Sequence, residues 1–265
     1  MTLASPMVDA AAVATTAVVM LETRGLCKRY GAIEVTRNVD LCIERGARHA
    51  LIGPNGAGKT TFVNLVTGVT EPSAGSIYLG GREVTSASAQ KRVAAGLART
   101  FQINTLFADL TVAENIAIAL SQRLGLAWKL WGRPAAHAEV VEQAAALLEQ
   151  LGLLTLAARR VNALAYGQRR MLEIAIALAL KPQVLLLDEP AAGIPNGESG
   201  MILDLLERLP ADIAILFIEH DMNLVFRFAK KITVLVEGAV LVEGKPDDIR
   251  ADERVRNVYL GRRHD

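Results

Sequence analysis

Cysteine is scarce in this chain, and only Cys27 and Cys42 occur. Two cysteines cannot form the disulfide framework of a small secreted domain or a four-ligand metal site. We expect both to be small buried hydrophobic side chains in a reducing compartment. The four histidines are scattered, with no pair four residues apart, so a metal held by a histidine or cysteine cluster is not expected.

The chain also has no excess of either charge and no long apolar run. Its 29 Lys and Arg against 28 Asp and Glu give a net charge of +1, so no general attraction to nucleic acid is expected. Residues 10–20 are largely apolar, but this stretch is shorter than the ~18 residues of a membrane-spanning helix and lacks the basic start of a secretory signal. We interpret residues 1–20 as a disordered extension, or as sequence upstream of a true start at Met20.

Hydrophobic residues are abundant, at 51% of the 265 residues, and 22% are charged. This composition excludes a disordered chain and is sufficient for the core of one large domain or two small ones. No sequence repeat of roughly 20–50 residues occurs, which excludes a repeat protein.

Two periodicities divide the chain. Residues 21–52 and 76–79 alternate as short strands do, which predicts a small antiparallel sheet with turns at Tyr30-Gly31 and Arg45-Gly46. From residue 184 onward, apolar runs typical of buried parallel strands alternate with helical patterns. The elements expected there are strand 184–187, helix 199–209, strand 213–218, helix 221–229 and a hairpin of 232–236 with 239–242. This alternation predicts an α/β sheet that binds ligands at the carboxyl ends of its strands.

A helical insert is predicted over residues 103–165. Thr111-Val-Ala-Glu114 is a capping box that starts a helix, and a second helical pattern, residues 140–151, ends at Gly152. Trp128 and Trp131 lie three residues apart within the insert, where they either pack in its core or contact a partner subunit.

A glycine-rich stretch carries the strongest functional signal. Strand 48–52 leads directly into Gly53-Pro-Asn-Gly-Ala-Gly58-Lys59-Thr60, and a helical pattern follows to residue 66. The glycines let the backbone N–H groups surround a phosphate chain, and the helix start adds its positive dipole end. Lys59 then supplies a charge for the β- and γ-phosphates, and the Thr60 hydroxyl is an oxygen ligand for Mg²⁺.

Two adjacent carboxylates follow the buried run at residues 184–187. Asp188 lies at the expected ligand edge of the sheet, where it can hold Mg²⁺ or the water bound to it. Glu189 is positioned to orient or deprotonate an attacking water. His220, after the next buried strand, and Gln102, after the run at residues 97–101, are weaker candidates for contact with the γ-phosphate, because single polar residues at such positions are often structural.

These motifs together resemble the nucleotide-binding subunits of ATP-binding-cassette (ABC) transporters. The resemblance covers roughly residues 21–261, and the motifs occur in the order of that family. Tyr30 matches the aromatic residue that stacks on adenine, Gln102 the Q-loop and His220 the switch histidine. Residues 164–168, Leu-Ala-Tyr-Gly-Gln, match the signature motif, and residues 184–189 match Walker B with its catalytic glutamate.

The resemblance implies an α/β P-loop NTPase core, with a small antiparallel β subdomain and an inserted helical subdomain, spanning residues 21–261 with a tail at 262–265. It implies that ATP binds at Tyr30, Gly53, Pro54, Asn55, Gly56, Ala57, Gly58, Lys59, Thr60 and Thr61, and, from a partner subunit, at Ala165, Tyr166, Gly167 and Gln168. It implies magnesium at Thr60, Gln102 and Asp188, and catalytic roles for Glu189, His220 and Gln102.

Such a subunit is expected to be an ATP hydrolase that works in a membrane complex. The implied partners are transmembrane permease subunits, a second ATPase subunit that is a different chain or a second copy, and indirectly a substrate-binding protein. The expected location is the cytoplasmic face of the plasma (inner) membrane, bound peripherally. Two other functions are alternatives: a stand-alone ATPase acting on ribosomes or DNA, and a degenerate, non-catalytic partner subunit.

Within the family, the chain is similar to the larger ATPase of branched-chain amino-acid importers. Arg99-Thr-Phe-Gln102, Asp188-Glu-Pro-Ala-Ala-Gly193 and Ile218-Glu-His-Asp-Met222 carry this similarity. Urea and other amide importers share much of the pattern, and they remain alternatives, as does an importer of other amino acids. Two departures from the family bear on hydrolysis: Ala165 stands where the wider family has Ser, and Pro195-Asn196 reverses the usual order, with a proline that cannot donate a backbone hydrogen bond.

Overall fold

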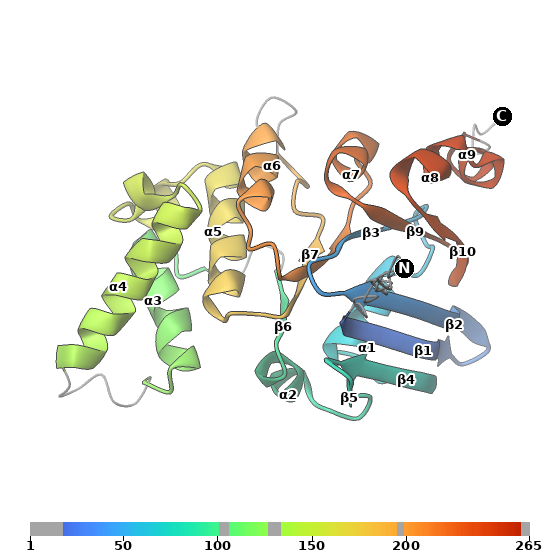
Figure 1. The fold of residues 1–265 in the computed structure, drawn as a ribbon, viewed down its shortest axis with the longest axis horizontal. Coiled ribbons are helices and arrows are strands. Elements are labelled where there is room, and N and C mark those ends of the chain that lie inside the picture. The colour runs from blue at the N-terminus through green and yellow to red at the C-terminus, as the bar shows by residue number, and fades with distance from the viewer. Residues whose placement is uncertain (1–17, 101–105, 127–133, 195–198, 261–265) are drawn as a thin grey trace, which may run out of the picture.

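The computed structural model describes residues 18–100, 106–126, 134–194 and 199–260. These residues form three layers, with a six-stranded sheet in the middle (Figure 1). Helices cover one face of this sheet, and an antiparallel sheet together with helix α1 covers the other. The α/β fold with an antiparallel β subdomain, expected from the sequence, is confirmed.

The antiparallel sheet has the strand order β2-β1-β4-β5. Its strands are β1 (Val19–Tyr30), β2 (Ile33–Glu44), β4 (Ala74–Leu79) and β5 (Arg82–Glu83). β1 and β2 have 12 residues each and are therefore longer than the short strands expected. The β1–β2 pairing shifts register between Thr23 and Leu26, and such an irregularity interrupts the alternation from which strand length is judged.

The six-stranded sheet has the order β10-β9-β3-β8-β7-β6, and only β10 runs antiparallel to its neighbour. Its strands are β3 (Arg48–Ile52), β6 (Leu97–Arg99), β7 (Val184–Asp188), β8 (Ala214–Ile218), β9 (Lys231–Val236) and β10 (Ala239–Gly244). Leu185 and Leu187 face the helical core, whereas Leu186 faces the antiparallel sheet. The strands are apolar on both faces because both faces are covered.

The described residues form nine helices, two of which begin or end where the capping signals of the sequence predict. They are α1 (Lys59–Thr67), α2 (Ala89–Ala94), α3 (Val112–Arg123), α4 (Pro134–Gln150), α5 (Tyr166–Ala179), α6 (Ser199–Glu207), α7 (Met222–Phe228), α8 (Pro246–Ala251) and α9 (Glu253–Leu260), with 3-10 turns at Leu154–Leu156 and Val161–Ala163. Thr111 and Glu114 form the predicted capping box of α3. Gly68 ends α1 in a left-handed conformation that glycine adopts without strain.

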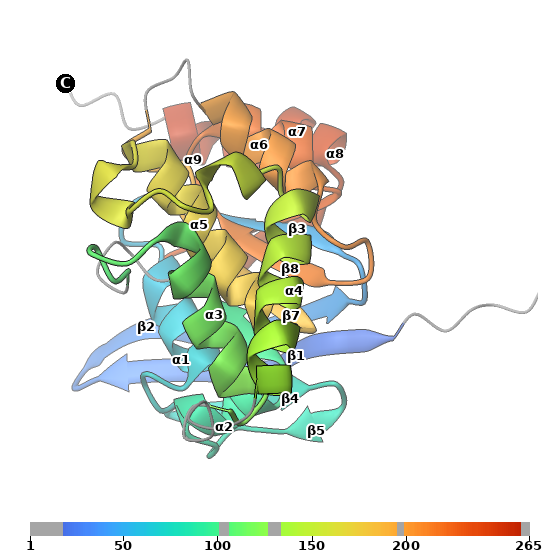
Figure 2. The same ribbon diagram turned by 90° about the vertical axis from the view of Figure 1, so that its left-hand side faces the viewer.

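The predicted helical insert is present in the described part of residues 103–165. Helices α3 and α4 pack together, with α5 beside them, at the end of the molecule farthest from the antiparallel sheet (Figures 1 and 2). Their apolar side chains join those of β7 and β8 in one continuous core. Trp128 and Trp131 lie outside the described residues.

The cysteines differ from expectation. Cys27 on β1 and Cys42 on β2 are free thiols, but both are half-buried rather than fully buried. The Cys27 sulfur accepts a hydrogen bond from the backbone N–H of Asn38 at 3.1 Å, which gives this side chain a polar contact at the sheet surface. No helix within the described ranges is long and apolar enough to span a membrane.

Candidate phosphate-binding site

The glycine-rich loop leaves the carboxyl end of β3 and enters α1. Gly58 immediately precedes α1 and has φ +94°, a conformation that side chains other than glycine rarely adopt. A Cβ atom at Gly53 would lie 2.2 Å from the backbone oxygen of Leu235, so only glycine fits there. At Gly56 a Cβ atom would meet nothing within 4 Å, which leaves space beside the middle of the loop.

Lys59 lies across this loop. Its ammonium group donates to the backbone oxygens of Gly53 at 2.7 Å and Pro54 at 3.1 Å. Burial lowers the pKa of Lys59, while the carboxylates of Glu189 and Asp188 act in the opposite direction. The loop therefore holds the positive charge that phosphate binding requires, and the carboxylates of Glu189 and Asp188 are close enough to act on it.

Asp188 ends β7 at the same edge of the sheet. In the strand register Asp188 pairs with Ile218, which also pairs with Leu51 of β3, so the carboxylate and the glycine-rich loop are close together. Its Oδ2 accepts a hydrogen bond from Arg99 Nη2 at 2.6 Å. The sequence identified Asp188 as a candidate but gave no role to Arg99.

Glu189 follows in an unusual backbone conformation, with φ +45°. Its N–H donates to the oxygen of Ile218 at 2.9 Å, and its Oε1 lies 3.7 Å from His220 Nδ1. Both side chains are accessible, with 67% of His220 and 36% of Glu189 exposed. A strained residue at such an edge is typical of a functional position, and the pair can face a substrate together.

Glu219 lies at this edge of the sheet, and no role for it was predicted from the sequence. It lies between Ile218 and His220, yet its side chain is 1% exposed. Its two oxygens accept backbone hydrogen bonds from Ala191 at 3.0 Å and His220 at 3.1 Å. The available signal was a carboxylate directly after a buried strand, next to a candidate histidine.

Tyr30 lies at the end of β1 with about half of its surface exposed. The ammonium of Lys28 lies 5.0 Å from the centre of its ring, a cation–π contact that the sequence did not predict. An exposed ring of this kind can stack on a planar base.

The signature segment begins α5, within the helical part of the molecule. Ala165 precedes the helix and is exposed, and its N–H donates to Gln168 Oε1 at 3.1 Å. The ring of Tyr166 lies against Gly193, where a Cβ atom would be 3.1 Å from its hydroxyl. In both views α5 lies with α3 and α4, whereas α1 lies beside the antiparallel sheet (Figures 1 and 2). Gln102, Pro195 and Asn196 lie outside the described residues.

The groups brought together here suit a nucleotide phosphate and a hard cation. The loop offers N–H groups at the start of α1 and a lysine charge, which fit phosphate oxygens. The exposed hydroxyl of Thr60 and the carboxylate of Asp188 are the oxygen ligands that Mg²⁺ prefers.

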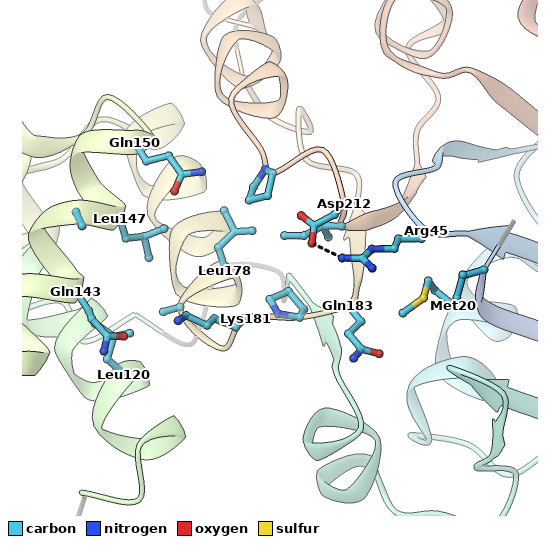
Figure 3. A pocket seen from close by; sticks show the side chains of 16 residues that line it. Met20, Arg45, Leu120, Gln143, Leu147, Gln150, Leu178, Lys181, Gln183 and Asp212 are labelled. Carbon is cyan, nitrogen blue, oxygen red and sulfur yellow. Dashed lines mark hydrogen bonds and ion pairs between the residues drawn. The ribbon is translucent and has the colours of Figure 1, made fainter. Parts of the chain in front are cut away.

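A cavity of about 680 Å³ lies elsewhere in the described part of the chain. It lies between α4, α5 and the turns before β7 and β8, with Leu147, Leu178 and Gln183 in its wall (Figure 3). Arg45 and Asp212 form an ion pair at 3.1 Å on its rim. Because Gln183 precedes β7 and Asp212 precedes β8, the cavity is at the amino edge of the sheet, opposite the glycine-rich loop.

Comparison with known proteins agrees with this geometry. The ABC transporter family matches residues 36–192, and the family described as branched-chain amino acid ATP-binding cassette transporter matches residues 239–265. LivG of Salmonella typhimurium, a high-affinity branched-chain amino acid transport ATP-binding protein, is 40% identical over 249 residues, covering 91% of this chain and 98% of that protein. BraF of Pseudomonas aeruginosa, with the same description, is 39% identical with the same coverage.

A solved structure of an ABC transporter ATP-binding cassette is also similar to this chain. The ADP conformation of MJ1267, an ATP-binding cassette of an ABC transporter, superposes with a TM-score of 0.80 at 28% identity, covering 92% of this chain and 99% of that one. The chain therefore belongs to the ABC transporter family, as an ATP-binding subunit that couples ATP hydrolysis to transport. Within that family it belongs with the ATP-binding proteins represented by LivG and BraF, which confirms the resemblance inferred from its motifs.

Proposed function

We propose that this chain is the ATP-hydrolysing motor of an importer for branched-chain amino acids. The observation that carries the proposal is the combination of an intact phosphate loop and carboxylate edge with relatives 39–40% identical over 91% of the chain, whose names specify that substrate. Retention of both Glu189 and His220 at 3.7 Å supports a catalytic subunit over a degenerate one.

In this proposal, Lys59 and the loop N–H groups hold the β- and γ-phosphates, and Tyr30 stacks on the adenine. Thr60, Asp188 and Gln102 would hold magnesium, which when bound would neutralise phosphate charge. Glu189 orients and deprotonates the attacking water, while His220, beside it, contacts the γ-phosphate.

A second ATPase subunit completes the site. Ala165, Tyr166, Gly167 and Gln168 of one subunit contact the γ-phosphate held by the other, and ATP joins the two. Within one subunit, α5 and its signature segment lie on the helical side, whereas α1 and the phosphate loop lie against the antiparallel sheet. This separation supports contact of the signature segment with the phosphate loop of another subunit. The dimer is bound peripherally to permease subunits at the cytoplasmic face of the inner membrane, and a substrate-binding protein delivers the amino acid to that permease.

Light scattering on the Glu189→Gln protein tests the dimer. ATP is expected to convert the monomer to a dimer, and the same protein with Lys59→Ala is expected to remain monomeric. A Glu189→Gln protein that binds ATP but stays monomeric would contradict a homodimer and would require a different ATPase as partner.

Uptake tests the substrate. The complex of this chain with its permease and binding protein, reconstituted in vesicles containing ATP, is expected to import labelled leucine, isoleucine or valine. Import of urea but not of these amino acids would show that the chain is instead the ATPase of an amide importer.

A further inference from the structure

Arg99 connects the two halves of the phosphate site. It ends β6, and its guanidinium donates to Asn64 Oδ1 from Nη1 at 2.9 Å and to Asp188 Oδ2 from Nη2 at 2.6 Å. The side chains of Arg99 and Asp188 are only 15% and 14% exposed. Asn64 lies on α1, the helix that begins at Lys59.

A planar guanidinium fixes the positions of two acceptors at once, and its hydrogen bonds to a carboxylate are short and strong. Here it joins the helix of the phosphate loop to the last residue of β7. The bond to Oδ2 restricts rotation of the Asp188 carboxylate. Residues that orient a metal ligand in this way commonly change metal affinity about 10- to 100-fold when they are replaced.

We propose that Arg99 is a positioning residue for magnesium: with Asn64 as its second anchor, it holds the Asp188 carboxylate at a fixed place relative to the phosphate loop. This inference rests on the proposed role of Asp188 at the magnesium site. It adds two residues, Arg99 and Asn64, to the machinery without placing either on the nucleotide.

Arg92 on α2, a second arginine that binds α1, provides a matched control. Arg92 is also buried and also binds α1, through hydrogen bonds to the backbone oxygens of Leu65 at 2.6 Å and Val66 at 2.7 Å. Its remaining partners are the backbone oxygens of Thr85 and Ala87, and Asp188 is not among them. Replacing Arg92 therefore disturbs the packing of α1 without touching the carboxylate.

The experiment measures how strongly the cation improves nucleotide binding. The probe is the non-hydrolysable analogue AMP-PNP, titrated by calorimetry in MgCl₂ and in EDTA, and Mn²⁺ bound with AMP-PNP is counted separately by electron paramagnetic resonance. The variants are Arg99→Lys, which keeps the charge but lacks the planar fork, Arg99→Met, which removes the charge, Asn64→Ala, which removes one anchor only, and Arg92→Lys. Thermal unfolding is recorded for each.

Arg99→Lys is expected to reduce about 10-fold both the increase in AMP-PNP affinity caused by Mg²⁺ and the affinity for Mn²⁺. Asn64→Ala is expected to reduce both by a smaller factor. Affinity in EDTA should stay within about twofold of wild type, because the phosphate loop is unchanged. Arg92→Lys should lower the melting temperature but keep the full cation effect.

The proposal is overturned if folded Arg99→Lys and Asn64→Ala proteins keep the wild-type cation effect. It is also overturned if Arg99→Met binds Mn²⁺ more tightly than wild type, because Arg99 would then act only as a charge that repels the cation. A wild-type protein that gains nothing from Mg²⁺ would instead contradict the proposed magnesium site itself.

Discussion

Glu219 Oε1 accepts a hydrogen bond from the backbone N–H of Ala191 at 3.0 Å, although Glu219 follows β8 and Ala191 follows β7. Its second oxygen accepts from the N–H of His220 at 3.1 Å. Burial raises the pKa of this carboxyl, and the backbone donors oppose that shift. One buried side chain thus joins the segment that carries Glu189 to the one that carries His220.

Replacing the Glu219 carboxylate should weaken the connection between the segments that carry Glu189 and His220. Glu219→Gln retains the size of the side chain but has only one oxygen, so one backbone N–H is left facing an amide NH₂. We expect a loss of about 1–3 kcal/mol in the free energy of unfolding and a fall in kcat of up to about 10²-fold, with KM for ATP little changed. Denaturant unfolding and steady-state ATPase assays measure both, and an unchanged kcat would limit Glu219 to a structural role.

Glu189→Gln should separate binding from chemistry. The amide cannot accept the proton of the attacking water, so hydrolysis should slow by about 10²–10⁴ while ATP affinity is retained. Phosphate release and calorimetry give the two quantities. Glu207→Gln on α6, an exposed position, is the control and should behave as wild type. Hydrolysis at the wild-type rate in Glu189→Gln would end the assignment of Glu189 as the base.

Lys59→Ala should abolish tight binding of Mg-ATP, because it removes the ammonium held over the loop by the oxygens of Gly53 and Pro54. Calorimetry with ATP and Mg²⁺ checks this. Lys91→Ala, on the exposed surface of α2, removes the same charge elsewhere and should bind normally. Equal affinities of the two variants would exclude the phosphate role of Lys59.

Tyr30→Ala should weaken ATP binding by about 1–3 kcal/mol if the exposed ring stacks on adenine. Tyr30→Phe keeps the ring and should keep most of the affinity, which makes it the matched control. Binding of an ATP fluorescent analogue modified on the phosphate side measures all three proteins. If Tyr30→Ala binds as tightly as Tyr30→Phe, the ring makes no contact with the base.

The sequence predicted the parts of the site that are local. Gly53 to Thr60 form one contiguous motif between a strand and a helix, and Asp188 ends an apolar run, so their proximity follows from the parallel sheet. The partners of these residues are not local. Arg99 meets Asp188 only because β6 pairs beside β7, across a separation of 89 residues.

The elements that sequence reasoning missed are short. β6 has three residues and β5 two, α2 and α8 have six each, and α9 has eight, too few to display a clear period. The buried position of Glu219 was also not apparent, because its burial depends on the segment after β7 that folds over it. Local patterns predict elements that are long enough to show an apolar face, and tertiary contacts determine the rest.

The last prediction concerns acid stability and a buried histidine. His49 on β3 is 1% exposed, and its Nε2 lies 2.7 Å from Thr233 Oγ1, which donates to Glu243 Oε2 at 2.7 Å. Burial lowers the pKa of His49 to about 4, with Glu243 opposing this shift and Lys231 adding to it. His49 is therefore neutral in the folded protein at pH values where it takes up a proton in the unfolded chain.

The direction in which the free energy of unfolding changes with pH follows from proton uptake. Between the unfolded pKa of about 6.5 and the folded value of about 4, only the unfolded chain binds the proton, so stability is present above pH 6.5 and is lost as the pH falls through this range. The loss is at most ~1.4 kcal/mol per pH unit. His49→Gln can still donate to Thr233 but does not titrate. The unfolding free energy of wild type minus that of His49→Gln, measured in urea from pH 7 to pH 4, should therefore fall steadily, and a difference that is constant across this range would show that His49 is charged in the folded protein or contributes nothing to acid unfolding.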